Sequence, residues 1–243
     1  MLIGVPKEVK NNEFRVGLTP TSVREVVAHG HEVIVEANAG IGIGRSDDDY
    51  AAQGATVLDT AEEIFARADM IVKVKEPQAV ERKMLRPGQI LFTYLHLAPD
   101  PEQTKDLVDS GAICIAYETV TDAKGRLPLL APMSQVAGRM SIQAGAHCLE
   151  RAQGGEGILI GGVPGIAPAK VAVIGGGVVG ENAIQMAVGM GADITVLDRN
   201  LDVLNHLSER FGPVLTTMYS TQAALEATVL EADLVVGAVL VKG

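Results

Sequence analysis

The chain has 243 residues, and 30 acidic against 20 basic side chains give it a formal net charge of −10. Apolar residues make up 47% of the sequence and charged residues 21%, which is typical of a folded globular protein and excludes general disorder. Because the acidic balance comes without a basic cluster, we expect no surface dedicated to nucleic acid or to anionic lipid.

The sequence carries no pattern typical of secretion or of metal binding. Its two cysteines, Cys114 and Cys148, have neither the spacing of a disulfide framework nor that of a zinc site. The N-terminus passes at once from apolar into charged residues, unlike a signal peptide, and the longer apolar runs are too short or too rich in glycine to span a bilayer. We therefore expect a cytoplasmic protein with no membrane partner and no metal site.

Short β-branched runs alternate with amphipathic stretches in the first half of the chain, which is typical of parallel strand and helix units. The clearest helices are predicted at 20–29 and 101–110, because each begins at a proline and is closed by a glycine. The predicted strands of this half span residues 2–5, 33–35, 70–74, 90–94 and 113–117.

A predicted turn at 122–128 marks the end of this first region. A long helix follows over 134–151, with Ser134 as its cap. We therefore divide the chain into a substrate domain over residues 1–130 and a nucleotide-binding domain over residues 131–243. The predicted strands of the second half span residues 171–174, 194–197, 214–216 and 234–236. These are four strands where a complete dinucleotide-binding fold has six, so we expect a longer natural protein.

The most specific motif is Gly175-x-Gly177-x-x-Gly180, which follows a predicted strand and opens a predicted helix. In this motif the first glycine allows a tight turn, the second lets a pyrophosphate approach the backbone, and the third lets the helix pack closely on the strand. The free N–H groups of the helix N-terminus then meet the phosphates. The pattern predicts dinucleotide binding.

Asp198 ends the next predicted strand, 18 residues after Gly180. An acid in this place accepts hydrogen bonds from an adenosine ribose and disfavours a 2′-phosphate, which predicts NAD as the cofactor. Arg199 follows directly and could meet a 2′-phosphate instead. The alternative without a nucleotide is a glycine-rich turn beside a surface aspartate.

Three polar side chains follow predicted strands of the first half and suit the chemistry of a nicotinamide-dependent enzyme. Arg15 lies after the first strand, and its guanidinium matches a substrate carboxylate. Lys75 ends the third strand, where alternation places it on the same face as Lys73. His96 follows the fourth strand, and an imidazole is a side chain suited to proton transfer near neutral pH. The alternatives are a solvated arginine, a lysine paired with Glu76 and a structural histidine.

Glu118 follows the fifth predicted strand. Its place would suit a buried acid, but the sequence shows no partner for it. We therefore interpret Glu118 as structural.

Several motifs together resemble bacterial L-alanine dehydrogenases, within the alanine dehydrogenase and transhydrogenase α-subunit family. In the first half the resemblance lies in residues 3–8, 13–16, 72–77 and 92–97. It continues in residues 129–134, 136–140 and 161–165, so that it covers essentially the whole chain.

The resemblance implies an α/β protein with two Rossmann-like domains, each a parallel sheet flanked by helices, with a cleft between them and the second domain incomplete. It implies NAD-dependent, reversible oxidative deamination of L-alanine to pyruvate and ammonium by a homo-oligomer, commonly a hexamer. Arg15 and Lys75 match the substrate-anchoring positions of the family, and His96 matches its catalytic histidine. The cofactor-contacting positions fall on Ser134, Val178, Val179, Asp198, Ser220, Val239 and Leu240.

Two departures from the family pattern bear on these expectations. Val203 stands where relatives usually have a basic residue that helps to hold the adenosine. The family chain also continues past Gly243, with an aspartate that partners His96, so we expect these 243 residues alone to be inactive. The alternative functions are an NAD-binding α subunit of proton-translocating transhydrogenase and a non-catalytic NAD-binding module.

Overall fold

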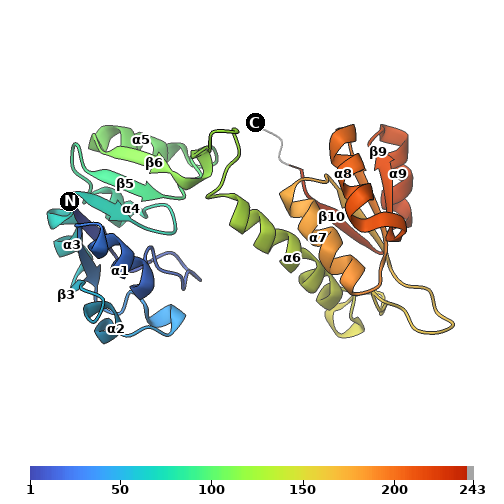
Figure 1. Cartoon of the computed structure of the whole chain (residues 1–243), viewed down its shortest axis with the longest axis horizontal. Coiled ribbons are helices and arrows are strands. Elements are labelled where there is room, and N and C mark those ends of the chain that lie inside the picture. The colour runs from blue at the N-terminus through green and yellow to red at the C-terminus, as the bar shows by residue number, and fades with distance from the viewer. Residues whose placement is uncertain (240–243) are drawn as a thin grey trace. The chain divides into compact units, whose positions relative to one another are not determined.

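The structure is a computed structural model that describes residues 1–239 (Figure 1). The chain divides into two compact units, and the division lies between Leu129 and Leu130. The substrate and nucleotide roles expected for these two units stay predictions. Within residues 1–239, no helix combines the length and the apolar character that crossing a membrane requires.

The first unit is built on one parallel sheet. Its strands, all within residues 1–129, lie in the order β3-β2-β1-β4-β5-β6. This is the 3-2-1-4-5-6 order of a doubly wound fold, with the topological switch point between β1 and β4. The strands are β1 (Leu2–Val5), β2 (Glu32–Glu36), β3 (Thr56–Leu58), β4 (Met70–Val72), β5 (Ile90–Thr93) and β6 (Ile113–Ala116).

The helices of the first unit begin and end at the residues that cap them. Thr19 accepts the N–H of Ser22 before α1, Asp100 accepts the N–H of Gln103 before α5, and Gly111 ends α5 with φ +68°. Both helices were predicted from a proline at the start and a glycine after the end, and both predictions are confirmed within a residue. The caps Thr19 and Asp100 were not predicted. The helical segments are α1 (Pro20–Ala28), η1 (Ile41–Ile43), α2 (Asp47–Ala51), α3 (Ala61–Arg67), α4 (Ala79–Arg82), α5 (Pro101–Ser110) and η2 (Tyr117–Thr119).

Helices cover both faces of this sheet, so its central strands are apolar on both sides. In β2, Val33 and Val35 pack into a cluster with Val23 of α1 and Tyr50 of α2. Ile34, between them, packs into the other cluster, which includes residues of α3 and α5. Burial on two faces explains why these strands appear in the sequence as apolar runs without a polar alternation.

The strands differ from the predicted ones at their carboxyl ends. β4, β5 and β6 end one or two residues before the predicted positions. In β4 the reason is visible, because the next free N–H groups, of Val74 and Lys75, are taken by the carboxylate of Glu8. Strand β3 was not predicted, since three residues are too few to show a period.

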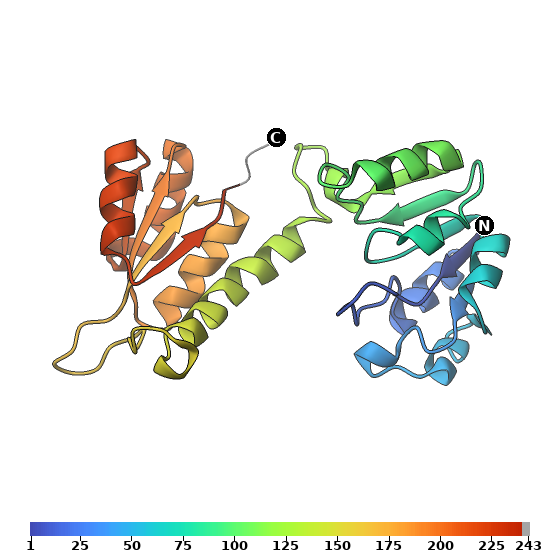
Figure 2. The same cartoon turned by 180° about the vertical axis from the view of Figure 1, so that it is seen from behind.

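The second unit also contains a parallel sheet, with the described strands in the order β10-β7-β8-β9 (Figure 2). The predicted strands of this half are confirmed, with small changes in their bounds. The strands are β7 (Lys170–Ile174), β8 (Asp193–Asp198), β9 (Leu215–Tyr219) and β10 (Leu234–Gly237). The helical segments are α6 (Ala131–Cys148), η3 (Arg151–Gln153), α7 (Val178–Gly189), α8 (Leu201–Phe211), η4 (Gly212–Val214) and α9 (Gln222–Glu231).

The start of α6 corrects one prediction. The helix begins at Ala131, and Ser134 lies inside it with its N–H donated to the carbonyl of Leu130, so Ser134 is not the cap. Pro132 explains the earlier start, because its fixed φ suits the first turn of a helix. The helix ends at Cys148, before the predicted Arg151.

Helices α6 and α7 run side by side in both views (Figures 1 and 2). Gly138 makes the close approach possible, since a Cβ there would lie 2.1 Å from the carbonyl oxygen of Val179. Arg139 then donates to the Asn182 side chain of α7 at 3.1 Å. This packing fixes the first turn of α7, which contains Gly180 and directly follows Gly175 and Gly177.

Candidate functional site

The three residues expected to carry chemistry lie at the same edge of the first sheet. Arg15 is in the loop after β1, Lys75 follows β4 and His96 follows β5. Strands β1 and β4 are neighbours at the switch point, and β5 is next to β4. Ligands of open α/β sheets bind outside the carboxyl ends of the strands at this point.

Arg15 is held by Glu13 through a fork of hydrogen bonds. Its Nε and its backbone N–H donate to Glu13 Oε1, both at 2.9 Å, and its Nη2 donates to Oε2 at 2.7 Å. The side-chain hydrogen bonds from Arg15 lower the pKa of Glu13 to about 2, and the charge of Lys75 acts in the same direction. The same pairing raises the pKa of Arg15, with a smaller effect from Tyr94. The charges of Lys75 and Tyr94 therefore interact with the Glu13–Arg15 pair.

The backbone of Lys75 is fixed on both sides. Glu8 Oε1 accepts the N–H of Val74 at 2.6 Å and the N–H of Lys75 at 3.4 Å. On the other side, Thr93 Oγ1 of β5 donates to the Lys75 carbonyl at 2.9 Å. Glu8 was not singled out in the sequence analysis, although it follows β1 at the edge where Lys75 was expected.

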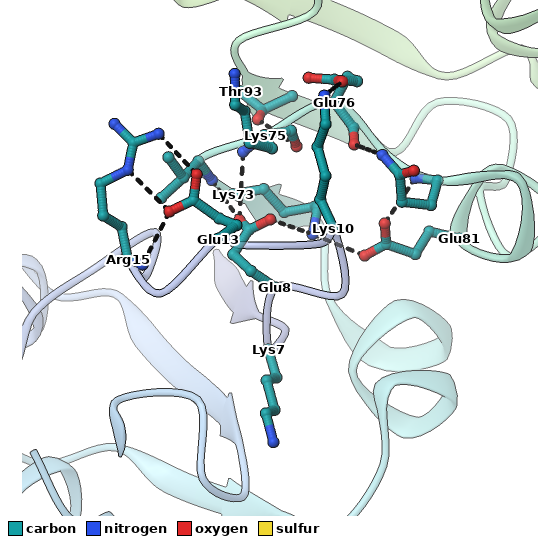
Figure 3. Close-up of polar contacts among 12 residues, drawn as sticks. Lys7, Glu8, Lys10, Glu13, Arg15, Lys73, Lys75, Glu76, Glu81 and Thr93 are labelled. Atoms are coloured by element: carbon teal, nitrogen blue, oxygen red, sulfur yellow. Dashed lines mark hydrogen bonds and ion pairs between the residues drawn. The ribbon is translucent and has the colours of Figure 1, made fainter. Parts of the chain in front are cut away.

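Lys73 has a different environment from Lys75 (Figure 3). Its side chain is fully buried, and its Nζ lies 3.1 Å from Glu8 Oε2 and 2.7 Å from Glu81 Oε1. Burial raises the pKa of Glu81, and the charge of Lys73 opposes that effect. The prediction that Lys73 and Lys75 share one face of a strand is wrong, because β4 ends at Val72.

His96 lies in the loop that follows β5. Its φ is +49°, and its ring stacks on that of Tyr94 with 5.9 Å between centroids and 13° between planes. Glu118 accepts the N–H of Leu95 at 3.0 Å and the N–H of His96 at 2.7 Å. No partner for Glu118 was predicted from the sequence. The clue to its partner was that Glu118 and His96 both follow strands at the same sheet edge.

The glycine motif of the second unit has the geometry of an anion cradle. Gly175 has φ +97°, and a Cβ on Gly180 would lie 1.8 Å from the Gly175 carbonyl oxygen, so both positions require glycine. Gly177 is the N-cap of α7 with no side-chain cap, and a Cβ there would meet no protein atom within 4 Å. No side chain caps the N–H groups at the N-terminus of α7, which leaves them available to an anion.

Asp198 is hydrogen-bonded to both the glycine loop and the loop after β8. Its Oδ2 accepts the N–H of Gly176 at 2.7 Å, and its Oδ1 accepts the N–H of Asn200 at 2.8 Å. The backbone carbonyl of Asp198 accepts the N–H of Ser220 at 3.0 Å. A surface pocket lies beside this carboxylate, lined by Asp198, Arg199, Asn200, Leu201, Asp202 and Tyr219.

The other expected cofactor positions lie around the same loop. Val178 and Val179 form the first turn of α7, and Ser134 lies one helical turn before Gly138 on α6. A Cβ on Gly175 would come within 2.8 Å of the side chain of Val239. Leu240 lies outside the described residues.

Val203, the departure from the family pattern, lies beside the glycine loop, because a Cβ on Gly176 would be 2.7 Å from it. Within residues 1–239, no group of three or more His, Cys, Asp or Glu side chains is arranged to hold a metal ion.

Curated proteins are similar to this chain over its full length. An alanine dehydrogenase of Halomonas elongata is 59% identical over 243 residues, and one of Mycobacterium tuberculosis (strain H37Rv) is 54% identical over 243 residues. Each comparison covers 100% of this chain and 66% of the relative. The chain therefore spans about two thirds of the length of the curated relatives it matches.

Solved structures and family models also match this chain. An L-alanine dehydrogenase structure matches with a TM-score of 0.94 and 53% identity, covering 100% of this chain and 67% of that one. A transhydrogenase from Sinorhizobium meliloti matches with a TM-score of 0.82 at 24% identity over 99% of this chain and 70% of that one, which shows the shared fold alone. Residues 4–137 match the family model "Alanine dehydrogenase/PNT, N-terminal domain" and residues 141–243 match its C-terminal counterpart. The chain belongs to the alanine dehydrogenase/PNT family.

Proposed function

We propose that the protein is an NAD-dependent alanine dehydrogenase. The reaction is L-alanine + NAD⁺ + H₂O → pyruvate + NH₄⁺ + NADH + H⁺, and it is reversible. The observation that carries this proposal is that curated alanine dehydrogenases are 50–59% identical to this chain along all of its 243 residues. By the same family relationship, we propose a cytoplasmic homo-oligomer, a hexamer, with no nucleic-acid or membrane partner.

Arg15 and Lys75 would hold the substrate carboxylate. Both are cations at the carboxyl edge of the sheet, beside the switch point. Because Glu13 occupies the Arg15 fork, a substrate carboxylate would compete with Glu13 for Arg15. Lys75 would provide a second positive charge. Hydrogen bonds with Glu8 and Thr93 already hold its backbone in place. Holding the carboxylate at two points orients the substrate Cα.

His96 would move the proton. In oxidative deamination, water adds to the substrate imine carbon, and the resulting hydroxyl group loses its proton as ammonia leaves. An imidazole accepts and returns protons near neutral pH. His96 would hydrogen-bond the substrate oxygen and carry this proton, with its ring oriented by the stacked ring of Tyr94.

NAD fits the residues of the second unit. The chemistry that the cofactor supplies when bound is acceptance of a hydride ion from the substrate Cα. Gly175, Gly177 and Gly180 would admit its pyrophosphate to the N–H groups at Val178 and Val179. Asp198 would accept hydrogen bonds from the adenosine ribose. Ser134, Ser220, Val239 and Leu240 are the remaining positions that we propose to contact it.

The test is NADH formation from NAD and L-alanine by the natural gene product that contains these residues. We expect turnover in the wild type and its loss in His96→Ala. Lys75→Ala should raise the KM for alanine and leave the KM for NAD unchanged. The exposed Lys105→Ala, which removes a cation that pairs with Asp109, is the matched control.

Two other results would overturn the proposal. Hydride transfer to an NADP analogue in a transhydrogenase assay, with no reaction of alanine, would indicate the transhydrogenase function. NADH binding without turnover of alanine or of that analogue would indicate a non-catalytic NAD-binding module.

A further inference from the structure

The turn that carries His96 has an unusual backbone conformation. His96 has φ +49°, in the left-handed region that residues other than glycine rarely occupy. The conformation is unfavourable for an isolated histidine, so the surrounding structure must stabilise it. The direction of the His96 side chain follows from this backbone geometry, and whatever holds the turn also aims the imidazole.

Glu118 holds the N–H groups of this turn. One carboxylate oxygen accepts from His96 N at 2.7 Å and from Leu95 N at 3.0 Å, and the other lies 3.3 Å from Leu95 N. Hydrogen bonds to an ionised carboxylate are stronger than those between neutral groups. Glu118 lies in η2 directly after β6, the neighbour of β5, so two adjacent strands place the carboxylate beneath the turn.

A second contact holds the carbonyl side of the same turn. Gln103 is fully buried in α5, and its Nε2 donates to the carbonyl of Leu95 at 2.6 Å. The ring of Tyr117, the residue before Glu118, packs edge-on against Tyr94 at 4.9 Å, and Tyr94 in turn stacks on His96. The residues of η2 therefore contact both the backbone of His96 and the ring on which its imidazole rests.

We propose that Glu118 is a positioning residue for His96. It acts through the backbone N–H groups of Leu95 and His96, which lock the left-handed turn and aim the imidazole at the substrate. The proposal rests on the proposed function, because it gives His96 the proton-transfer role. A structural carboxylate that only stabilised the first unit would affect folding and leave the orientation of His96 unchanged.

The experiment compares Glu118→Gln and Glu118→Asp with Asp49→Asn. Glu118→Gln removes the charge at nearly constant size, and Glu118→Asp keeps the charge but withdraws it by one methylene group. Asp49 is a matched control because its carboxylate also accepts a backbone N–H, that of Ser46, and completes the cap of α2. Helix α2 packs on β3, at the other end of the sheet from β5 and β6. Each variant is made in the natural gene product, and kcat, KM and thermal stability are measured.

We expect Glu118→Gln to lower kcat by about tenfold to a hundredfold, with the KM for NAD nearly unchanged, because a small displacement of a catalytic group has effects of this size. Glu118→Asp should fall between Glu118→Gln and the wild type. Asp49→Asn should lower the melting temperature and leave kcat within about twofold, as expected for loss of a helix cap alone.

A readout that does not need turnover is the NMR spectrum of ¹³C-labelled histidine. The chain has five histidines, and His96→Ala identifies the His96 signal. The proposal predicts that this signal moves in Glu118→Gln and stays in place in Asp49→Asn. An unmoved signal, or wild-type kcat, in Glu118→Gln would overturn it. If Glu118→Gln does not fold, Glu118→Asp decides by the same two criteria. If the wild type does not turn over alanine, the proposed function has failed, and the NMR signal alone decides whether Glu118 positions His96.

Discussion

Glu8 Oε2 and Lys73 Nζ lie 3.1 Å apart, and both side chains are buried. Glu8 follows β1 and Lys73 follows β4, so the pair connects the two strands on either side of the switch point. The other oxygen of Glu8 accepts the N–H groups that lead to Lys75. A buried ion pair therefore supports the backbone of a residue proposed to bind substrate.

Replacing Lys73 by Met should destabilise the protein strongly. The change leaves Glu8 and Glu81 buried without their cation, and removing one partner of a buried ion pair costs about 3–5 kcal/mol. Urea-induced unfolding, followed by circular dichroism, measures the loss. Lys105→Met is the control, since Lys105 and Asp109 form an exposed pair whose loss should cost about 1 kcal/mol or less. Equal losses in the two variants would show that the buried pair contributes no more to stability than the exposed pair does.

Replacing Gly177 by Ala should weaken cofactor binding without unfolding the protein. The added methyl group meets no protein atom within 4 Å, but it would enter the space proposed for the pyrophosphate. Isothermal titration with NADH should show at least about a tenfold weaker affinity, the effect expected when the backbone can no longer approach the phosphates closely.

Gly189→Ala is the matched control for this variant. Gly189 is the last residue of the same helix, and a methyl group there is also unopposed. It should stabilise α7 by up to about 1 kcal/mol and leave NADH affinity unchanged. If both variants bound NADH as the wild type does, the glycine motif would not be the pyrophosphate site.

Replacing Asp198 by Asn should reduce the preference for NADH over NADPH. Asparagine can still accept the N–H of Gly176, but it no longer repels a 2′-phosphate, and Arg199 lies next to it. Titrations with both nucleotides should show a weaker affinity for NADH and a stronger one for NADPH. Asp193→Asn, at the opposite end of β8, should change neither. An unchanged ratio in Asp198→Asn would contradict the assignment of Asp198 to the ribose.

The pairing of Glu13 with Arg15 should contribute to stability against acid. The pKa of Glu13 is lowered from 4.5 to about 2 in the folded protein, so its contribution is fully present above pH 4.5 and is lost as the pH falls towards 2. The Arg15 side chain is 42% exposed, so the contribution should be about 1 kcal/mol or less. Glu13→Gln should therefore make the stability less dependent on pH within this window, as urea midpoints at several pH values would show.

Glu36 provides the opposite case. Burial raises its pKa, so its carboxylate destabilises the folded state above that pKa, and acid removes the penalty. Glu36→Gln should make the loss of stability with falling pH steeper, whereas Glu13→Gln should make it shallower. Changes of the same sign in both variants would contradict this account.

Local patterns were enough to predict most of the elements. Pro101 and Gly111 predict the bounds of α5 because caps act through neighbouring residues, and the spacing of Gly175, Gly177 and Gly180 predicts the strand, turn and helix of the second unit. The strand ends and the start of α6 were less accurate, since contacts with distant residues decide where a ladder ends. Glu8 ends β4 in this way from 66 residues away.

The same distinction between local patterns and distant contacts applies to the candidate site. The sequence by itself determined which side chains follow strands, Arg15, Lys75 and His96 among them, because residue type and apolar runs are local properties. Only the tertiary structure decided that Lys73 is buried between two glutamates and that Glu118 holds the His96 turn. These pairings join residues 22 or more positions apart in most cases, and they depend on the order in which parallel strands assemble. The strand order is a property of the whole sheet, and no local pattern of residues predicts it.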